Sequence, residues 1–305
     1  MENILKRKLH LGISACMYGA KVRYNAKGWD MLGELGRERA SFLWEPVCPE
    51  VMSGLGVPRS SIRLSGGNGH DFWEGKASIK NRLGENMSEM IKAGSLACQG
   101  ALERAKIDAF IFMEGSPSCG VYRTSLKNKK LGNPPGVFGA LLLENMYFLI
   151  PAQDLFSPIK WWDWRRRLTT FVWVKEHRLD DVEDLKKIWH VIRLLCTELD
   201  SEFSAKFAEK LSKISTKNFE ELNAMRSELL SLLRKPTDVE KLKEGLWKNY
   251  CHMKDYDHIE IPEVLPPEAL RSHTHLSTEL THVEIEAKKK GLFFGSSPIL
   301  YLGDR

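Results

Sequence analysis

DAFIFMEGSPSCG, residues 108–120, is the stretch from which the fold of the first half of the chain can be read. Its first six residues form a short apolar run that is typical of a buried β-strand. The glycine, serine and proline residues that follow end the strand and begin a loop. Cys119 is therefore predicted to lie just beyond the carboxyl end of a strand, and open α/β sheets bind their ligands along that edge.

Strands and helices are predicted to alternate around this stretch. Three further apolar runs have strand character, at 8–14, 41–47 and 147–150. Apolar residues recur at helical spacing between them, over 29–39, over 78–105 (one long helix, or two broken near Gly94) and over 137–145. The order predicts an α/β fold, a mostly parallel sheet with flanking helices.

The character of the chain changes at about residue 157. Three tryptophans are followed by three arginines in the segment 161–167, which predicts an amphipathic helix with its tryptophans in an interdomain core rather than a platform for single-stranded nucleic acid. Helical patterns continue to about residue 254 and predict a bundle of four or five helices, whereas residues 255–305 look mixed. We therefore expect two domains, 1–156 and a mainly α-helical accessory domain, 157–305, whose role the sequence does not indicate.

Composition limits where the protein acts. No apolar run approaches the roughly 20 residues that a membrane-spanning helix needs. Residues 1–8 lack the apolar segment of a secretory signal. The net charge of +5 is too small to imply nucleic-acid binding by itself. We expect a cytoplasmic protein without a membrane partner, in which the six cysteines stay reduced unless a metal binds them.

Three of the cysteines follow predicted strands of the same sheet. Parallel strands end at one edge, so Cys16, Cys48 and Cys119 are expected to converge there. Three thiols in a reducing compartment suggest a soft metal, either zinc or an iron–sulfur cluster. The spacing is not that of a zinc finger. Small buried thiols are the alternative, and this is the preferred interpretation for the cysteines within helical patterns, Cys98, Cys196 and Cys251.

Four motifs, in order, resemble the thiouracil desulfurase family. They are ISACxxGxxVRY at 13–24, PVCPExxxGLxxPR at 46–59, SPSCG at 116–120 and GVxxALL at 136–142. The resemblance covers roughly residues 8–155. It implies a compact α/β fold in which Cys16, Cys48 and Cys119 hold a [4Fe-4S] cluster. In that family one iron has no protein ligand and captures the sulfur of a thiocarbonyl substrate.

The reaction implied by the resemblance is a non-redox, hydrolytic desulfuration. A thiolated pyrimidine of the 2-thiouracil or 4-thiouridine type becomes the oxo form, and sulfide is released. The attacking water needs a base within hydrogen-bond reach, and Glu50, two residues after Cys48, is the candidate. The alternative role for Glu50 is to cap a helix that starts after Pro49.

Two serines flank the third cysteine. Ser116 or Ser118 could position the water or bond the substrate ring, and Ser116 is preferred because it stands further from the turn of Cys119. The alternative is a serine that bonds the backbone of its own turn. Three more residues in motif loops are candidates for binding a pyrimidine or a phosphate, with surface salt bridges as the alternative: Arg23, Tyr24 and Arg59.

Departures from the family pattern bear on the substrate. They are Asn25, Ser53-Gly54 and Met113-Glu114-Gly115. We expect a small thiolated base or nucleoside as substrate. Two other functions stay open: a desulfurase or modification enzyme that binds thiolated tRNA through the helical half, and a non-catalytic iron–sulfur redox sensor.

Overall fold

The computed structural model describes residues 2–125, 133–214 and 219–303. Its contacts divide the chain into two compact units. One, here called the α/β unit, comprises Lys8–Phe156. The other, the helical unit, comprises Met1–Arg7 together with Ser157–Arg305. The first seven residues therefore group with the helical part of the chain.

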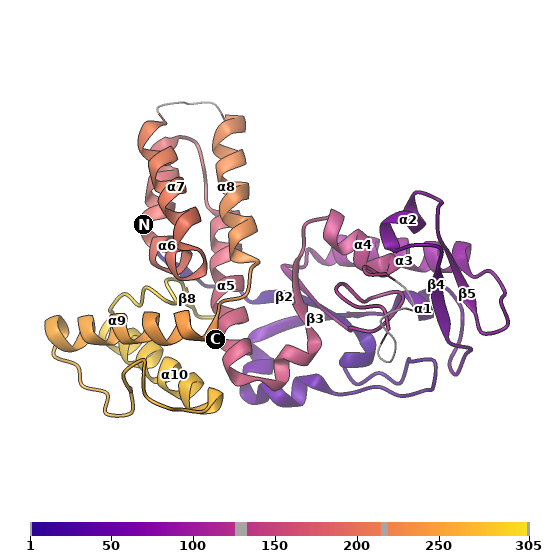
Figure 1. Ribbon diagram of the computed structural model, residues 1–305, viewed down its shortest axis with the longest axis horizontal. Coiled ribbons are helices and arrows are strands. Elements are labelled where there is room, and N and C mark those ends of the chain that lie inside the picture. The colour runs from indigo at the N-terminus through magenta and orange to yellow at the C-terminus, as the bar shows by residue number, and fades with distance from the viewer. Residues whose placement is uncertain (1, 126–132, 215–218, 304–305) are drawn as a thin grey trace. The chain divides into compact units, whose positions relative to one another are not determined.

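The α/β unit is built on a four-stranded sheet with the order β3-β2-β6-β7, and all three pairings are parallel (Figure 1). Ser14 at the end of β2 lies opposite Val47 at the end of β3, so these two strands stop at the same level. The α/β class predicted from the sequence is confirmed. The strands are β2 (Leu9–Ser14), β3 (Phe42–Val47), β6 (Ala109–Phe112) and β7 (Phe148–Pro151).

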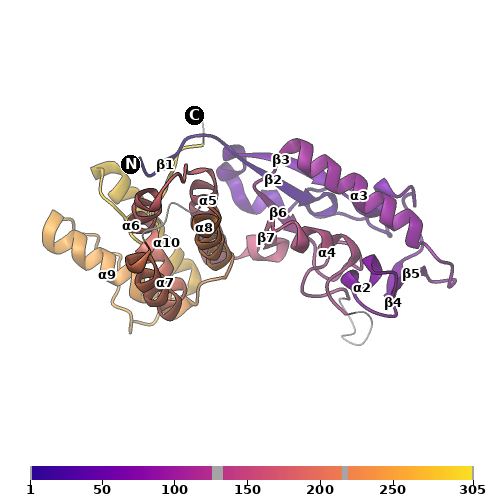
Figure 2. The same ribbon diagram turned by 90° about the horizontal axis from the view of Figure 1, so that it is seen from above.

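Two helices pack on one face of this sheet, α3 (Ser88–Ala105) and α4 (Val137–Glu144). Phe110 and Phe112 of β6 contact them in one apolar core that also contains Cys98. The segments η2 (Met31–Ser41) and η3 (Ala152–Phe156) contact each other on the other face (Figures 1 and 2). Both are 3-10 rather than α-helical.

The helix predicted over 78–105 was wrong in its first part. Residues 78–81 form β5 (Ser78–Asn81), which pairs with β4 (Ile62–Ser65) in an antiparallel two-stranded sheet. Ile79, Leu83 and Met87 are spaced like the face of a helix, but Leu83 is 79% exposed and Gly84 has a φ of +86°. A positive φ interrupts a right-handed helix, so the helix begins only at Ser88.

The helical unit has five described helices between residues 158 and 257, which agrees with the four or five predicted to about residue 254. The additional helix, α10, lies in the segment that the sequence analysis left as mixed. Ser272 caps it, and its buried face repeats at helical spacing through Leu276, Leu280 and Val283. The helices are α5 (Pro158–Glu176), α6 (Val182–Leu199), α7 (Ser201–Lys213), α8 (Phe219–Leu233), α9 (Val239–Asp257) and α10 (His273–Lys290).

The N-terminal residues join this unit through a small sheet. β1 (Ile4–Leu5) pairs in parallel with β8 (Leu300–Tyr301), and the indole of Trp173 in α5 donates a hydrogen bond to the carbonyl of Glu2 at 3.2 Å. None of the described helices has both the length and the apolar character needed to cross a membrane.

Helix α5 buries charged side chains as well as its tryptophans. Asp163 accepts hydrogen bonds from Arg166 at 3.0 Å and from Arg167 at 2.9 Å. Arg166 also bonds Glu198 of α6 at 2.7 Å. We call these four residues the buried ion network. The prediction of an amphipathic helix was right that the tryptophans are buried, but these two arginines are 2% and 0% exposed, because carboxylates inside the unit neutralise them.

Candidate functional site

The three cysteines predicted from the sequence meet at the carboxyl edge of the sheet. Cys16 lies in the short η1 turn (Ala15–Met17) that continues β2, and Cys48 directly follows β3. Cys119 lies in the loop after β6. Because β3, β2 and β6 are parallel neighbours, the three loops lie together, and all three cysteines line one cavity of about 410 Å³.

The thiols in this cavity are largely withdrawn from water. Burial raises the pKa of Cys16 to about 12, although the nearby Arg23 opposes that shift. Burial likewise raises the pKa of Cys48 and, well above its ordinary value, that of Cys119. Cys48 and Cys16 are close enough to raise the pKa of Cys119 further. At neutral pH the three groups are therefore neutral thiols, and a metal would have to displace their protons.

Each sulfur nevertheless has a hydrogen-bond donor that favours its thiolate form. The Arg23 side chain bonds Cys16, and the amides of Glu50 and Val51 bond Cys48. The hydroxyl of Ser14 bonds Cys119, while its oxygen accepts the Met113 amide at 3.0 Å. Donors of this kind stabilise negative charge on sulfur.

Three thiols around one cavity are the kind of donor set that an iron–sulfur cluster takes. Within the described parts of the chain, no three His, Cys, Asp or Glu side chains are spaced to hold one metal ion. Arg23, which lines the same cavity, has a buried Nε without a hydrogen-bond partner.

Glu50 lies in α1 (Pro49–Met52), immediately after Cys48. Its Oε2 accepts hydrogen bonds from Arg59 Nε at 3.1 Å and from Arg59 Nη2 at 2.6 Å. Its Oε1 accepts the hydroxyl of Ser118 at 3.0 Å. The Nη1 of Arg59 donates to the carbonyls of Val22 and Gly56. Arg59 also lines the cavity. Its guanidinium already donates hydrogen bonds to Glu50 and to backbone carbonyls.

The two serines have different surroundings. The oxygen of Ser116 accepts the amides of Ser118 at 3.2 Å and of Cys119 at 3.1 Å. This is the local role that the sequence analysis named as its alternative. The side chain of Ser118 is fully buried and bonds Glu50 instead of its own turn.

The other predicted substrate-binding residues lie towards the opening of the cavity. Arg23 stacks its guanidinium 4.5 Å from the ring centre of Trp29. Tyr24 lines the cavity and is 39% exposed. Both residues come from the loop after β2, and an aromatic ring and a planar cation there can stack on a heterocycle.

The sequence analysis missed two arginines of this cavity. Arg63 of β4 and Arg82 after β5 line it, and Arg82 donates to the hydroxyl of Ser61 at 2.9 Å. Arg82 was missed because residues 78–82 were read as part of a helix, and Arg63 was missed because no strand was predicted at 62–65, which pairs with that segment. Among the described residues that line the cavity, Glu50 is the only carboxylate, and Arg59 neutralises it. The opening therefore carries positive charge.

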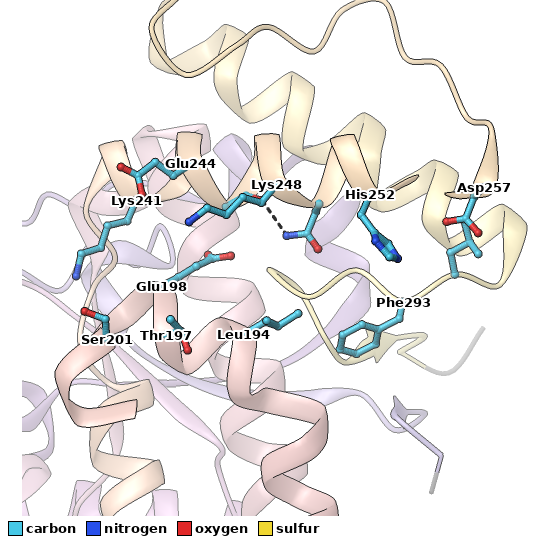
Figure 3. A pocket seen from close by; sticks show the side chains of 13 residues that line it. Leu194, Thr197, Glu198, Ser201, Lys241, Glu244, Lys248, His252, Asp257 and Phe293 are labelled. Carbon is cyan, nitrogen blue, oxygen red and sulfur yellow. Dashed lines mark hydrogen bonds between the residues drawn. The ribbon is translucent and has the colours of Figure 1, made fainter. Parts of the chain in front are cut away.

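A second cavity, of about 670 Å³, lies in the helical unit (Figure 3). It is lined from α6, the start of α7, α9 and the segment after α10, and no cysteine is among its described lining residues. Polar side chains of its lining already have partners within the protein. Glu198 pairs with Arg166 and accepts a hydrogen bond from the hydroxyl of Ser296. The amide of Asn249 likewise bonds Gly295 and Ser296. The smaller cavity, which three thiols line, is therefore the candidate site.

Comparison with known proteins agrees with this choice. The 2-thiouracil desulfurase family matches residues 11–154. A protein of Bacillus subtilis (strain 168), the uncharacterized YbbK, is 30% identical over 148 residues, which are 47% of this chain and 95% of that protein. The chain belongs to the 2-thiouracil desulfurase family. The resemblance inferred from the four motifs is confirmed, and it concerns the N-terminal half.

A solved structure of this kind is that of TudS, described as a [4Fe-4S]-dependent thiouracil desulfidase. It is 25% identical, with a TM-score of 0.37, and covers 49% of this chain and 93% of that chain. The family match contains every residue that the sequence analysis assigned to the site. It ends before the helical unit resumes at Ser157.

Proposed function

We propose that the α/β unit removes sulfur from a thiolated pyrimidine, with a [4Fe-4S] cluster held by Cys16, Cys48 and Cys119. The observation that carries the proposal is one buried and two half-buried thiols on one cavity, each with a donor that favours its thiolate form. Bound there, the cluster would supply a soft Lewis acid that prefers sulfur to oxygen. Membership of the 2-thiouracil desulfurase family supports the substrate class.

The overall reaction is an exchange of sulfur for oxygen. Water adds to the thiocarbonyl carbon, the carbon–sulfur bond breaks and a carbonyl forms. Both protons of the water leave with the sulfur as hydrogen sulfide, so no electron donor or acceptor is consumed. The chain has to provide a group that takes a proton from the water and later returns it.

Glu50 is our candidate for that group. Its Oε2 is held by two hydrogen bonds from Arg59, and its Oε1 faces Ser118. A carboxylate fixed on one oxygen can accept a proton on the other. We assign Arg59 to positioning Glu50 rather than to contacting substrate, because its donors are already used.

We assign Ser118 to positioning Glu50, because its hydroxyl bonds Glu50 Oε1 and its fully buried side chain does not line the cavity. Ser116 lines the cavity, but its oxygen accepts the amides of the turn that presents Cys119. The two serines therefore have different roles, and only that of Ser118 reaches Glu50 directly. Tyr24 and Arg23, from the loop after β2, are assigned to the pyrimidine ring.

A second candidate substrate is favoured by the positive opening of the cavity. Arg63 and Arg82 lie there without a carboxylate other than Glu50 among the described lining residues, and arginine pairs well with phosphate. This charge suits a thiolated nucleotide, or one within a tRNA, better than a free base.

The experiment begins with anaerobic reconstitution and measurement of iron, sulfide and visible absorbance per chain. Sulfide release is then assayed with 2-thiouracil, 4-thiouridine and 4-thiouridine monophosphate. Iron binding with turnover is expected. A protein without iron, unaffected by serine at the three cysteine positions, would end the proposal; a reversible cluster signal without turnover would indicate a redox sensor.

The opening is tested by Arg63→Ala and Arg82→Ala. Each should raise KM for the monophosphate about tenfold or more, the factor expected when a hydrogen bond to a charged group is lost. The KM for 2-thiouracil should not change. Equal effects on both substrates would mean that these arginines do not read a phosphate.

A further inference from the structure

Glu114 is a buried carboxylate that closes the loop carrying Cys119. It follows β6 after a single residue and is 6% exposed. Its Oε1 accepts the amide of Tyr122 at 3.1 Å, and its Oε2 accepts the amide of Arg123 at 3.0 Å. The amide of Gly115 donates to the carbonyl of Arg123 at 2.9 Å. Residues 114–123 therefore form a closed ring.

The ring holds its charge without an ion pair. Among the described residues Glu114 has no ion-pair partner, although the charge of Arg123 acts on it. Burial raises the pKa of Glu114, and the amides of Tyr122 and Arg123, together with that charge, act against the shift. A buried carboxylate is costly unless its oxygens are hydrogen-bonded, so these amides are what makes the position tolerable.

The inside of the ring is tightly packed. Gly120 sits against the carbonyls of Ser116 and Arg123, and a Cβ at this position would overlap both oxygens. Ser116 bonds the amide of Cys119 within the same ring. A ring closed at Glu114 and filled at Gly120 leaves the backbone of Cys119 little freedom.

We propose that Glu114 is a positioning residue, which fixes the Cys119 loop in its ligand-ready form before any cluster is bound. The ligand role of Cys119 rests on the proposed function. The ordering role of Glu114 rests on its two amide contacts and does not need the cluster. Since the loop is ordered in advance, cluster binding need not supply the free energy that orders it.

The test is the rate at which a maleimide alkylates each cysteine in metal-free, full-length protein, measured by peptide mass spectrometry. Glu114→Gln keeps the size of the side chain but can accept only one of the two amides. Cys119 should then react about 10- to 100-fold faster, because hydrogen bonds to a charged group contribute factors of this size to an opening equilibrium. Glu89→Gln, on the exposed start of α3, should leave the rate unchanged.

Cys98 and Cys196 are internal controls, because both are buried and neither belongs to the ring. Their rates should stay at the wild-type value. If they rise with that of Cys119, the variant has unfolded, and the milder Glu114→Asp decides by the ratio of Cys119 to Cys98 labelling. A wild-type ratio in the folded variant would overturn the proposal.

Reconstitution separates this inference from the proposed function. If the wild type takes up iron, Glu114→Gln should take up less or lose it faster in air. If the wild type takes up none, the cluster proposal fails, but the labelling ratio still decides the role of Glu114.

Discussion

Two polar clusters of the molecule differ in whether neighbouring side chains of opposite charge neutralise them. In the buried ion network of the helical unit, Asp163 faces Arg166 and Arg167, and Arg166 also faces Glu198. In the α/β unit, three thiols share a cavity, and their hydrogen-bond donors favour a charge that the thiols do not carry in this state.

The pKa shifts run in opposite directions for this reason. Burial alone would raise the pKa of Asp163, but Arg167 and Arg166 outweigh it and the pKa is lowered. Burial raises the pKa of the three cysteines, and no neighbouring charge outweighs it. A buried set of charges that neutralise one another needs no ligand but is costly to break, whereas thiols surrounded by donors for the thiolate form indicate where a ligand binds.

The largest expected effect breaks the cysteine cluster. Cys16→Ser, Cys48→Ser or Cys119→Ser should each abolish retention of the cluster and lower sulfide release at least about a thousandfold, because thiolates are the ligands of iron–sulfur clusters. Iron per chain and initial rates provide the measurement. Cys196→Ser, which changes a buried thiol of the helical unit, should retain both the iron and the activity. If all four variants have the same iron content and rate, the three thiols of the cavity are not cluster ligands.

Next in size is the loss of the proposed base. Glu50→Gln should lower kcat by about 10²- to 10⁴-fold, the usual range for a positioned acid or base, while iron content stays the same. Arg59→Lys should have a smaller effect, because one of the two bonds to Glu50 Oε2 remains available. Loss of iron together with activity would instead give Glu50 a structural role.

The ion network should respond in stability and not in chemistry. Asp163→Ala leaves two buried arginines without this carboxylate and should lower the free energy of unfolding by about 3–5 kcal/mol. Denaturant unfolding followed by tryptophan fluorescence measures it. Glu202→Ala, which removes an exposed pair with Lys206, is the matched control and should change little. A drop in iron content of folded Asp163→Ala would show that the two clusters are coupled.

The same residue predicts a response to acid. Because the pKa of Asp163 is lower in the folded protein, its contribution is complete above its unfolded pKa and is lost as the pH falls below that value. Asp163→Asn should therefore flatten the acid limb of the stability profile of the helical unit. An unchanged limb would mean that other carboxylates control it.

The smallest effect sharpens the assignment within the cysteine site. Ser118→Ala should reduce kcat about tenfold and leave iron content intact, because it removes one hydrogen bond to Glu50. Ser116→Ala should instead weaken cluster retention, because its oxygen holds the amide of Cys119. The reverse pattern would restore the preference for Ser116 drawn from the sequence.

Much of the site could be predicted because it depends on where strands end. Each cysteine follows an apolar run, and parallel strands bring such positions to one edge whatever their distance in the sequence. The prediction failed for the antiparallel pair β4–β5, where Ile79, Leu83 and Met87 are spaced like the apolar face of a helix. Arg63 and Arg82 were lost with it.

Side-chain partners were beyond the sequence for a different reason. The partner of Glu50 could have been solvent, a helix end or substrate, and the structure supplies Arg59 and Ser118. Arg166 and Arg167 look like surface residues in the sequence, yet they are buried because Asp163 and Glu198 lie beside them.

The sequence by itself therefore determined the α/β class, the family and the convergence of Cys16, Cys48 and Cys119. These follow from local apolar periodicity and from the geometry shared by all parallel sheets. Only the tertiary structure decided which serine faces Glu50, what holds Arg59, and how Glu114 closes the Cys119 loop. Hydrogen bonds are short and directional, so they depend on side-chain positions that only the packed fold specifies.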